Sequence, residues 1–420
     1  MQEICNMKRI EFDTAVIGGG AAGLSAAAKC AENDLKTVII ERENRTGGVL
    51  NQCIHSGFGV HYFQTELTGP EYALRLADKL KSSDVEIMLG ASVTAIAENN
   101  GKYDLTVYSK THGVFIITTR TVILAMGCRE RCRGNIGIPG ERCAGVFNAG
   151  FAQQLINTEG YLPGSKAVIV GSGDIGLIMA RRLTWSGVKV ECVVEIMPYP
   201  AGLSRNIAQC LEDFSIPLHL AHTVTEICGR ERVEGVKIAP LVNGEPDLQQ
   251  EKFIACDTVL FSVGLVPENE IARLCGIELD PVTKGAKVDG NLMTSKAGIF
   301  ACGNVLHVHD LVDFVSQEAE RAAVSAVRLC KGTLNAADDA NICAAEGVRY
   351  VVPQKFSSAC GGKFFMRSTF VADTAQLTVK NINGEVIFSK KLHYVKPAEM
   401  LTFELPPINS IGAIATLEKL

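Results

Sequence analysis

The chain has 420 residues, enough for two or three domains with sizeable cores. A hydrophobic content of 47%, a charged content of 21% and 40 glycines are typical of a globular α/β protein with many tight turns. The net charge of −5 and the lack of a Lys/Arg cluster disfavour a nucleic-acid-binding surface. No apolar run reaches the ~18 residues of a membrane span, and no signal-peptide pattern precedes the first strand, so we expect a cytoplasmic protein.

A dinucleotide-binding motif opens the chain. A short buried strand, a glycine-rich turn, an alanine-rich helix and a second strand ending on an acid follow one another over residues 12–41. This is a βαβ unit with the pattern G-x-G-x-x-G and Glu41 placed 18 residues after Gly23. Gly18 permits the tight turn, Gly20 lets backbone N–H groups approach a pyrophosphate, and Gly23 allows close packing of helix and strand. The helix N-terminus favours phosphate and Glu41 is placed to bond a ribose diol; the alternative is an ordinary βα turn.

The next hundred residues alternate between loop, helix and strand patterns. After the glycine pair Gly47-Gly48, the loop 49–59 has the composition of a segment approached closely by a ligand or another backbone. An amphipathic pattern predicts a helix over 70–82. Four strand-like runs follow, the last closed by Gly127: 93–97, 103–108, 114–119 and 121–125. A meander in this place is compatible with a cofactor domain that another domain interrupts.

The opening pattern then occurs a second time. A strand leads into Gly171-Ser172-Gly173-Asp174-Ile175-Gly176, a helix follows, and a strand over 189–194 ends on Glu195, 19 residues after Gly176. Two such motifs predict two dinucleotide sites. An acid at the end of the second motif favours the ribose 2′-OH of NAD over a 2′-phosphate. Arg181 and Arg182 lie inside the following helix, and we expect them to be solvated.

The last part of the chain changes character. A buried strand over 259–263 precedes Gly264, and a helix is expected over 311–330. Small polar residues without periodicity predict a linker over 333–346. From there to residue 420 the alternation of apolar and polar residues predicts a small β domain, with a hairpin turn at Asn383-Gly384.

The chain resembles the two-dinucleotide-domain flavoproteins of the pyridine nucleotide–disulfide oxidoreductase superfamily. The resemblance lies in the two βαβ motifs and in two further segments, Leu124-Ala125-Met126-Gly127 and Gly298-Ile299-Phe300-Ala301-Cys302-Gly303-Asn304. The resemblance covers about residues 10–332. It implies an α/β fold with two Rossmann-like domains: a discontinuous FAD domain over 1–140 and 280–332, an inserted NAD domain over 141–279, and the small β domain after them.

The resemblance also implies the residues of each cofactor site. The FAD-binding residues expected from it are Gly18, Gly20, Ala22, Gly23, Glu41, Arg42, Gly47, Gly48, Ala125, Gly127, Gly303 and Asn304. Those expected for NAD are Gly171, Gly173, Asp174, Ile175, Gly176, Glu195 and Gly264. The segment 298–304 would approach the ribityl and phosphate region of the flavin, with Asn304 where the family usually has Asp. The helix after it would point its positive end at the flavin pyrimidine ring.

The chain departs from the disulfide reductases at the redox-active motif. Those enzymes carry two cysteines shortly after a Gly-Gly pair, whereas Asn51-Gln52-Cys53-Ile54-His55 holds only one, so dithiol chemistry at this place is excluded. The 15 cysteines of the chain include no C-x-x-C pair, and the nearest two, Cys128 and Cys132, look structural. We therefore expect no metal or iron–sulfur centre.

Three groups of residues leave alternatives open. Cys53 could be a thiol facing the flavin, as in single-cysteine NADH oxidases and peroxidases, or a packed loop cysteine. His55 could orient that thiol or act as an acid or base, or simply bond the backbone. His307 and His309 could contact the isoalloxazine, cap the following helix or lie in solvent.

The loop 51–55, the segment 128–131 and the strand-rich tail look like the small flavoprotein subunit found beside anaerobic glycerol-3-phosphate dehydrogenase-type flavoenzymes, a group similar to subunits of opine oxidases, hydrogen cyanide synthase and sarcosine oxidase. We therefore expect an FAD-dependent oxidoreductase that passes a hydride between NAD(H), preferred over NADP(H), and FAD. Its expected partner is a second flavoprotein, the dehydrogenase subunit for a small hydroxy or amino substrate; a homodimer is the alternative. The rival functions are a stand-alone oxidase or peroxidase using Cys53, and a non-catalytic subunit that holds FAD.

Overall fold

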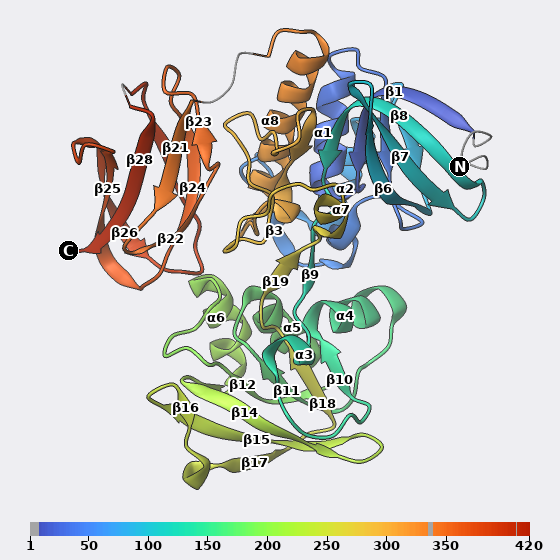
Figure 1. Ribbon diagram of the computed structural model, residues 1–420. Coiled ribbons are helices and arrows are strands. Elements are labelled where there is room, and N and C mark those ends of the chain that lie inside the picture. Colours follow the sequence, from blue (N-terminus) through green and yellow to red (C-terminus); the bar gives the residue numbers. More distant parts are fainter. Residues whose placement is uncertain (1–7, 335–338, 409) are drawn as a thin grey trace. The chain divides into compact units, whose positions relative to one another are not determined.

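The computed structural model describes residues 8–334, 339–408 and 410–420. The chain divides into two compact units: unit 1 comprises Met1–Cys128 and Pro267–Leu420, and unit 2 comprises Arg129–Val266 (Figure 1). Unit 2 is thus an insertion, with bounds about a dozen residues earlier than the expected 141–279. No helix among the described residues is long and apolar enough to cross a membrane.

Unit 1 is built on a sheet of seven strands in the order β5-β2-β1-β8-β7-β6, with β20 paired to β8. Its strands are β1 (Arg9–Ile17), β2 (Thr37–Ile40), β5 (Glu86–Met88), β6 (Ala91–Asn99), β7 (Lys102–Ser109), β8 (Gly113–Leu124) and β20 (Ile299–Ala301). The pairs among β5, β2, β1, β8 and β20 are parallel, and β8, β7 and β6 form an antiparallel meander.

The strand β8 unites two runs that the sequence suggested were separate. It pairs antiparallel with β7 over 113–119 and parallel with β20 over 122–124. Arg120, the exposed residue between the two runs, bonds the carbonyl of Cys330 at 2.6 Å and does not interrupt the strand. The break in the apolar pattern therefore marks a change of partner and not a turn.

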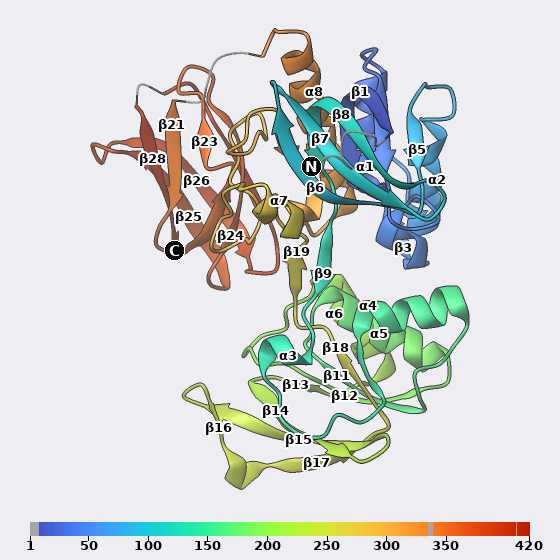
Figure 2. The same cartoon turned by 45° about the vertical axis from the view of Figure 1, so that its right-hand side comes forward.

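Two long helices pack together on this sheet. The alanine-rich α1 (Ala21–Ala31) is buried along nearly its whole length and lies beside α8 (Val312–Cys330), as Figures 1 and 2 show. Small side chains let the two helix backbones approach closely.

The helix expected over 70–82 is shorter: α2 spans Gly69–Asp78 and is capped by Thr68 and Glu71 in a capping box. The smaller elements here are the 3-10 helices η2 (Gly48–Gln52) and η6 (Gly303–Val305), the strands β3 (Ser56–Phe58) and β4 (Leu67–Thr68), and α7 (Glu270–Leu274).

The C-terminal part of unit 1 is a β domain of two sheets. One has the order β23-β21-β28-β25-β26 and the other β22-β24-β27. Phe356, Phe364 and Phe403 lie in its core. The bounds are β21 (Ala340–Ala344), β22 (Val348–Val352), β23 (Lys355–Phe356), β24 (Gly362–Ser368), β25 (Ala372–Asn381), β26 (Val386–Val395), β27 (Leu401–Leu405) and β28 (Gly412–Lys419).

One prediction for this region is wrong and another is right. The linker expected over 333–346 contains β21, which belongs to the β domain; residues 335–338 of that linker lie outside the described residues. The strand was missed because its partner in the parallel pair, β28, lies some seventy residues further along the chain, and local composition carries no sign of it. The hairpin at Asn383-Gly384 is present between β25 and β26.

Unit 2 contains a second parallel sheet, in the order β10-β18-β11-β12-β13, and a smaller antiparallel layer of β14, β15, β16 and β17. The sheet strands are β10 (Val146–Asn148), β11 (Lys166–Val170), β12 (Lys189–Val194), β13 (Leu218–His219) and β18 (Thr258–Phe261). The layer consists of β14 (His222–Gly229), β15 (Val233–Val242), β16 (Glu245–Pro246) and β17 (Lys252–Ala255). The helices are α3 (Arg133–Ile136), α4 (Ala149–Gln154), η3 (Leu155–Glu159), α5 (Asp174–Trp185), α6 (Ser204–Cys210), η4 (Glu212–Phe214) and η5 (Leu248–Gln250), and the connecting strands are β9 (Cys128–Glu130) and β19 (Leu265–Pro267).

Candidate cofactor sites

Four segments of unit 1 that are distant in sequence meet at the N-terminus of α1. A Cβ atom added to Gly18, whose φ is +104°, would lie 2.5 Å from the carbonyl oxygen of Ala125. One added to Gly48 would lie 3.2 Å from the Cα of Gly20. One added to Gly303 would lie 3.0 Å from the Cβ of Ala22. Side chains are therefore excluded along this edge, which leaves backbone N–H groups and a helix N-terminus facing outward, the cradle that a dinucleotide pyrophosphate requires.

Glu41 completes this cradle at the end of β2. It is buried, and its carboxylate accepts hydrogen bonds from the N–H of Gly19 at 2.6 Å and of Glu43 at 2.8 Å. The carboxylate is thereby held against the glycine turn, with lone pairs left over for a ribose hydroxyl. The residues present fit the adenosine half of FAD.

The other residues expected to bind FAD differ in how they contact the rest of unit 1. Gly47 donates to the carbonyl of Gly19 at 2.8 Å, and Gly23 packs so closely that a Cβ would meet the Gly18 carbonyl oxygen at 1.8 Å. Arg42 is exposed and its guanidinium lies 3.7 Å from the carboxylate of Glu43. Gly127 has φ of +72° and open space where a Cβ would stand. Asn304 uses its amide within the protein: Oδ1 accepts from the N–H of His309 at 3.0 Å, and Nδ2 lies 3.6 Å from the sulfur of Cys128.

Unit 2 repeats the same construction. Gly171 has φ of +93°, and a Cβ added to it would lie 2.2 Å from the carbonyl oxygen of Ser262. The N–H of Gly176 donates to the Ser262 hydroxyl at 3.0 Å. Gly173, the N-cap of α5, has open space beyond the Ser262 hydroxyl at 3.4 Å. Ser262 therefore supports the turn from the neighbouring strand, a role that no sequence motif indicated.

Glu195 stands at the end of β12 as Glu41 does at the end of β2. It is buried and accepts from the N–H and the hydroxyl of Ser172, at 2.8 and 2.6 Å, and from the N–H of Met197 at 2.9 Å. In both sites the acid thus bonds the second residue of its glycine motif and the residue two positions after itself.

The remaining expected NAD residues have structural contacts as well. The Asp174 carboxylate accepts from the N–H of Leu203 and the side chain of Asn206, at 2.9 and 2.6 Å, which joins α5 to α6. Ile175 packs against the core of unit 2. The carbonyl of Gly264 accepts from the N–H of Arg131 at 2.9 Å.

Cys53 and His55 lie in the loop after η2. The Cys53 thiol is half-buried and donates to the carbonyl of Val49 at 3.3 Å, and burial raises its pKa to about 12. A thiol with this pKa is protonated at neutral pH and is a poor nucleophile. The His55 Nδ1 lies 3.0 Å from the carbonyl oxygen of Ser56, and its ring lies 5.0 Å from that of Phe58.

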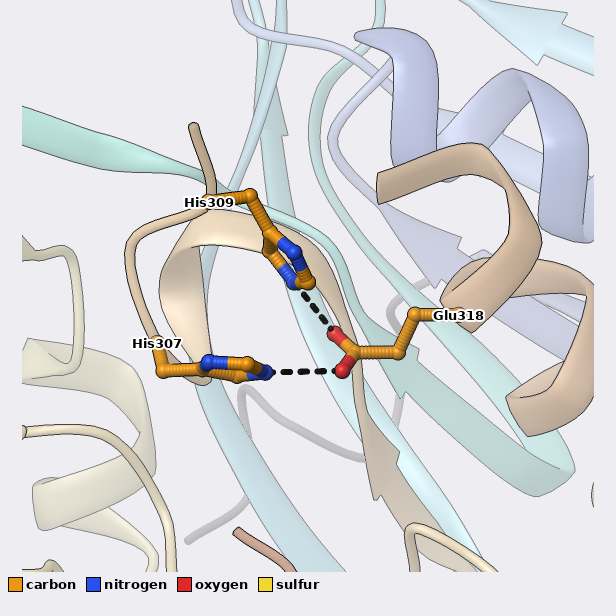
Figure 3. A group of neighbouring side chains, drawn as sticks. All are labelled: His307, His309 and Glu318. Carbon is orange, nitrogen blue, oxygen red and sulfur yellow. Dashed lines mark hydrogen bonds and ion pairs between the residues drawn. The ribbon is translucent and has the colours of Figure 1, made fainter. Parts of the chain in front are cut away.

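The expectations for His307 and His309 as helix-capping or solvent-exposed residues are wrong, because both are buried beside Glu318 (Figure 3). The Nε2 of His307 donates to Glu318 Oε1 at 2.8 Å, and that of His309 to Oε2 at 3.1 Å. The N–H of Gly303 donates to the same Oε2 at 2.7 Å. Sequence reasoning missed Glu318 because nothing in a helical pattern distinguishes a buried acid from one on a solvated face.

The sequence suggested no metal, yet these three side chains are of the type that could hold one, with ligand atoms within 4.8 Å of one another. Their geometry favours hydrogen bonds instead. Metal-bound histidines usually donate the other ring N–H to an acceptor, whereas Nδ1 of His307 and His309 has no partner among the described residues. Burial opposes ionisation of Glu318, but its two histidines and their hydrogen bonds hold its pKa below the usual range. Burial lowers the pKa of His307, so this ring is neutral at pH 7.

Known proteins with similar sequences include subunits of hydrogen cyanide synthase and of opine oxidase, and a thioredoxin reductase. Hydrogen cyanide synthase subunit HcnB of Pseudomonas protegens is 27% identical over 64% of this chain and 60% of its own length. One of the opine oxidase subunits of Agrobacterium tumefaciens is 23% identical, over 70% of this chain and 61% of its own. Thioredoxin reductase of Treponema pallidum is 28% identical, over 70% of this chain and 89% of its own length. This chain thus spans less than two thirds of the length of the first two.

The fold and the family agree with these matches. The crystal structure of T. acidophilum thioredoxin reductase superposes with a TM-score of 0.62 at 25% identity, over 76% of this chain and 98% of that one. The expected α/β fold with two Rossmann-like domains is confirmed. The family model described as pyridine nucleotide-disulphide oxidoreductase matches residues 12–328, so this chain belongs to that family of FAD-dependent enzymes that use a pyridine nucleotide.

Proposed function

We propose that this enzyme transfers a hydride between NAD(H) and FAD, with FAD in unit 1 and NAD(H) in unit 2. The observation that carries the proposal is the pair of matched cradles, each with a glycine turn free of side chains and a buried acid bonded to that turn. Bound FAD would supply the redox chemistry. The chain would bind and orient the two cofactors, through the FAD and NAD residue sets expected from the sequence, with Ser172 and Ser262 added to the second.

A preference for NADH over NADPH follows from the surroundings of Glu195. A carboxylate at this position bonds a ribose diol and repels a 2′-phosphate. The nearby arginines of α5 are engaged elsewhere: Arg182 donates to Asn157 at 2.7 Å, and Arg181 stacks 4.9 Å from the Trp185 ring centroid. Both contacts orient these guanidinium groups within unit 2, which disfavours them as 2′-phosphate ligands.

The rival function as an oxidase or peroxidase through Cys53 is disfavoured by the state of its thiol. Peroxide reduction at cysteine needs a thiolate, and burial raises the pKa of Cys53 to about 12. The carbonyl contact of this thiol with Val49 offers no positive charge to lower that value. The hydride step itself requires orientation of the two cofactors and no thiol.

We further propose that the chain acts as the electron-transfer subunit of a complex whose other subunit is a flavoprotein dehydrogenase for a small hydroxy or amino substrate. Relatives named as subunits of hydrogen cyanide synthase and of opine oxidase support this. Among the described strands of the β domain, β26 forms one edge of its sheet, with Val386 and Tyr394 exposed on it.

Anaerobic stopped-flow reduction of the FAD-loaded protein tests the proposed reaction. NADH should bleach the flavin absorbance faster than NADPH. Replacement of Glu195 by alanine should slow reduction at low NADH and narrow that preference, whereas Glu191→Ala, a change of a neighbouring acid on β12, should leave it unchanged. A flavin that neither nucleotide reduces would contradict the proposal, and faster reduction by NADPH would contradict the preference.

A further inference from the structure

The buried carboxylate of Glu318 lies where it can set the position of a cofactor-binding turn. It projects from the second turn of α8 and accepts the Gly303 N–H at 2.7 Å. Gly303 in turn lies against Ala22 at the start of α1, where a Cβ would approach to 3.0 Å. Any shift of the Gly303 turn therefore changes the cradle at the N-terminus of α1.

Glu318 is held in its charged form by groups from one short loop. Burying an unpaired carboxylate is strongly unfavourable. Here its two oxygens accept one N–H bond each from His307 and His309 (Figure 3). A third N–H bond comes from the backbone of Gly303. Because both histidines belong to the segment 307–310, the position of that segment determines whether the carboxylate keeps its partners.

The C-terminal β domain covers this segment. The Phe365 ring of β24 lies 5.4 Å from the His307 ring and 5.9 Å from the His309 ring, and the Tyr350 ring of β22 lies 6.2 Å from that of His307. These aromatic rings keep water away from the hydrogen bonds of Glu318, and hydrogen bonds in a dry site are stronger.

Arg367 of β24 ties the same segment down by polar contacts. Its guanidinium donates to the Val308 carbonyl at 3.1 Å and forms an ion pair with Asp310. The Asp310 carboxylate also accepts the N–H of Met400 at 2.6 Å. The loop is thus clamped between α8 on one side and the β domain on the other.

We propose that Glu318 is a positioning residue for the flavin site. The C-terminal β domain supports this role by holding the 307–310 segment against Glu318. The proposal rests on the assignment of Gly303 to the FAD site. The β domain then acts on FAD affinity through Arg367, Asp310, the two histidines and Glu318, without touching the cofactor itself.

The experiment compares FAD affinity with fold stability in the full-length protein. The variants are Glu318→Gln and Arg367→Ala, with Arg367→Lys as the conservative change. Two controls alter similar residues outside the clamp: Ser325→Ala on α8, whose hydroxyl bonds its own helix at 3.2 Å, and Asn381→Ala in the β domain, which bonds Glu385 at 2.7 Å. Apoprotein is titrated with FAD, its unfolding temperature is measured separately, and bound metal is determined by elemental analysis.

We expect Glu318→Gln and Arg367→Ala each to raise the Kd for FAD about tenfold, since each removes a charge-assisted contact. Arg367→Lys should restore part of the affinity, and the controls should retain it even where they lower the unfolding temperature. Unchanged FAD affinity in both Glu318→Gln and Arg367→Ala would overturn the inference. A stoichiometric metal that is bound by the wild type and lost only from Glu318→Gln would also overturn it. If Glu318→Gln fails to fold, the Arg367 pair decides alone. A wild type that binds no FAD refutes the proposed function instead, so the two failures are distinct.

Discussion

Glu41 is the side chain on which FAD binding should depend most. Its carboxylate bonds Gly19 and Glu43, and a bound ribose would add further charge-assisted hydrogen bonds. Such bonds are worth about 1.5–3 kcal/mol, so Glu41→Ala should weaken FAD binding roughly 10- to 100-fold.

The measurement is the flavin content of purified protein together with titration of apoprotein by FAD fluorescence. The matched control is Glu43→Ala, since Glu43 is an exposed acid two residues away whose side chain lies outside the cradle. Wild-type protein that stays colourless after incubation with excess FAD would refute the assignment of the first site.

Cys53 should be dispensable for reduction of the flavin by NADH. Burial keeps its thiol protonated, with a pKa raised to about 12, and hydride transfer needs no thiolate. Cys53→Ser is therefore expected to reduce its flavin at the wild-type rate in stopped flow. If the variant kept this rate but lost NADH-dependent turnover of peroxide or oxygen, the single-cysteine oxidase function would be correct instead.

Residues that act through local sequence were predictable, and residues that act through tertiary contacts were not. The glycines of both motifs follow from the backbone geometry of one turn, and Glu41 and Glu195 follow at a set distance along the chain. Glu318 and Ser262 could not be found in this way, because their hydrogen-bond partners come from other segments. His307 and His309 were noticed as residues, but their burial required the β domain to be in place.

At the scale of elements, α8 and the 307–310 segment before it carry the groups that make the fold sensitive to acid. Burial lowers the pKa of His307, and despite burial the histidines hold that of Glu318 below 4.5. Both pKa values are lower in the folded state than in the unfolded chain, so at acidic pH the unfolded chain binds more protons. The free energy of unfolding therefore decreases as the pH is lowered, starting below pH 6.5 for His307. Arg321 of α8, Glu404 of β27 and Arg367 of β24 are the further charged groups that act on this cluster.

The expected result is a flatter stability profile in His307→Gln than in wild type. A native histidine that stays neutral costs up to about 1.4 kcal/mol of unfolding free energy for each pH unit below its unfolded pKa. Urea unfolding of apoprotein at a series of pH values below 6.5 measures this difference, to which titrating groups distant from His307 contribute equally in the two proteins. Parallel profiles of the two proteins would show that His307 titrates normally in the fold.

The elements themselves show where sequence patterns stop being informative. The second βαβ unit is local and was placed to within a residue, as was α8, whereas β1 begins at Arg9, ahead of the expected strand. The errors fell on β21, whose partner β28 lies far along the chain, and on β8, where a change of partner resembled a turn. Long-range pairing leaves no periodic trace in a single sequence, and for that reason both features required the structure.

For the whole molecule, we expect isolation from the native source to yield a complex with a second flavoprotein subunit. The complex should reduce NAD when it is given a small hydroxy or amino substrate, glycerol 3-phosphate among those tested. Tyr394→Lys on the exposed edge strand β26 should weaken the association and leave flavin reduction by NADH unchanged. Recovery of the isolated chain alone, with high NADH oxidase turnover, would contradict the subunit role.

The interruption of unit 1 by unit 2 has a consequence for biosynthesis. The sheet of unit 1 pairs Leu124 with Ala301, and the N–H of Glu268 already bonds the Gly127 carbonyl at 3.0 Å across the insertion. Unit 2 is continuous, so it can fold while the ribosome is still translating the remainder. Unit 1 must wait for β20 and α8 to leave the exit tunnel before its sheet and Gly303 turn exist. On the proposed assignment of FAD to unit 1, FAD binding is therefore a late event for each nascent chain, and translation that stops before α8 would release a polypeptide in which unit 2 is complete and the proposed flavin site is absent.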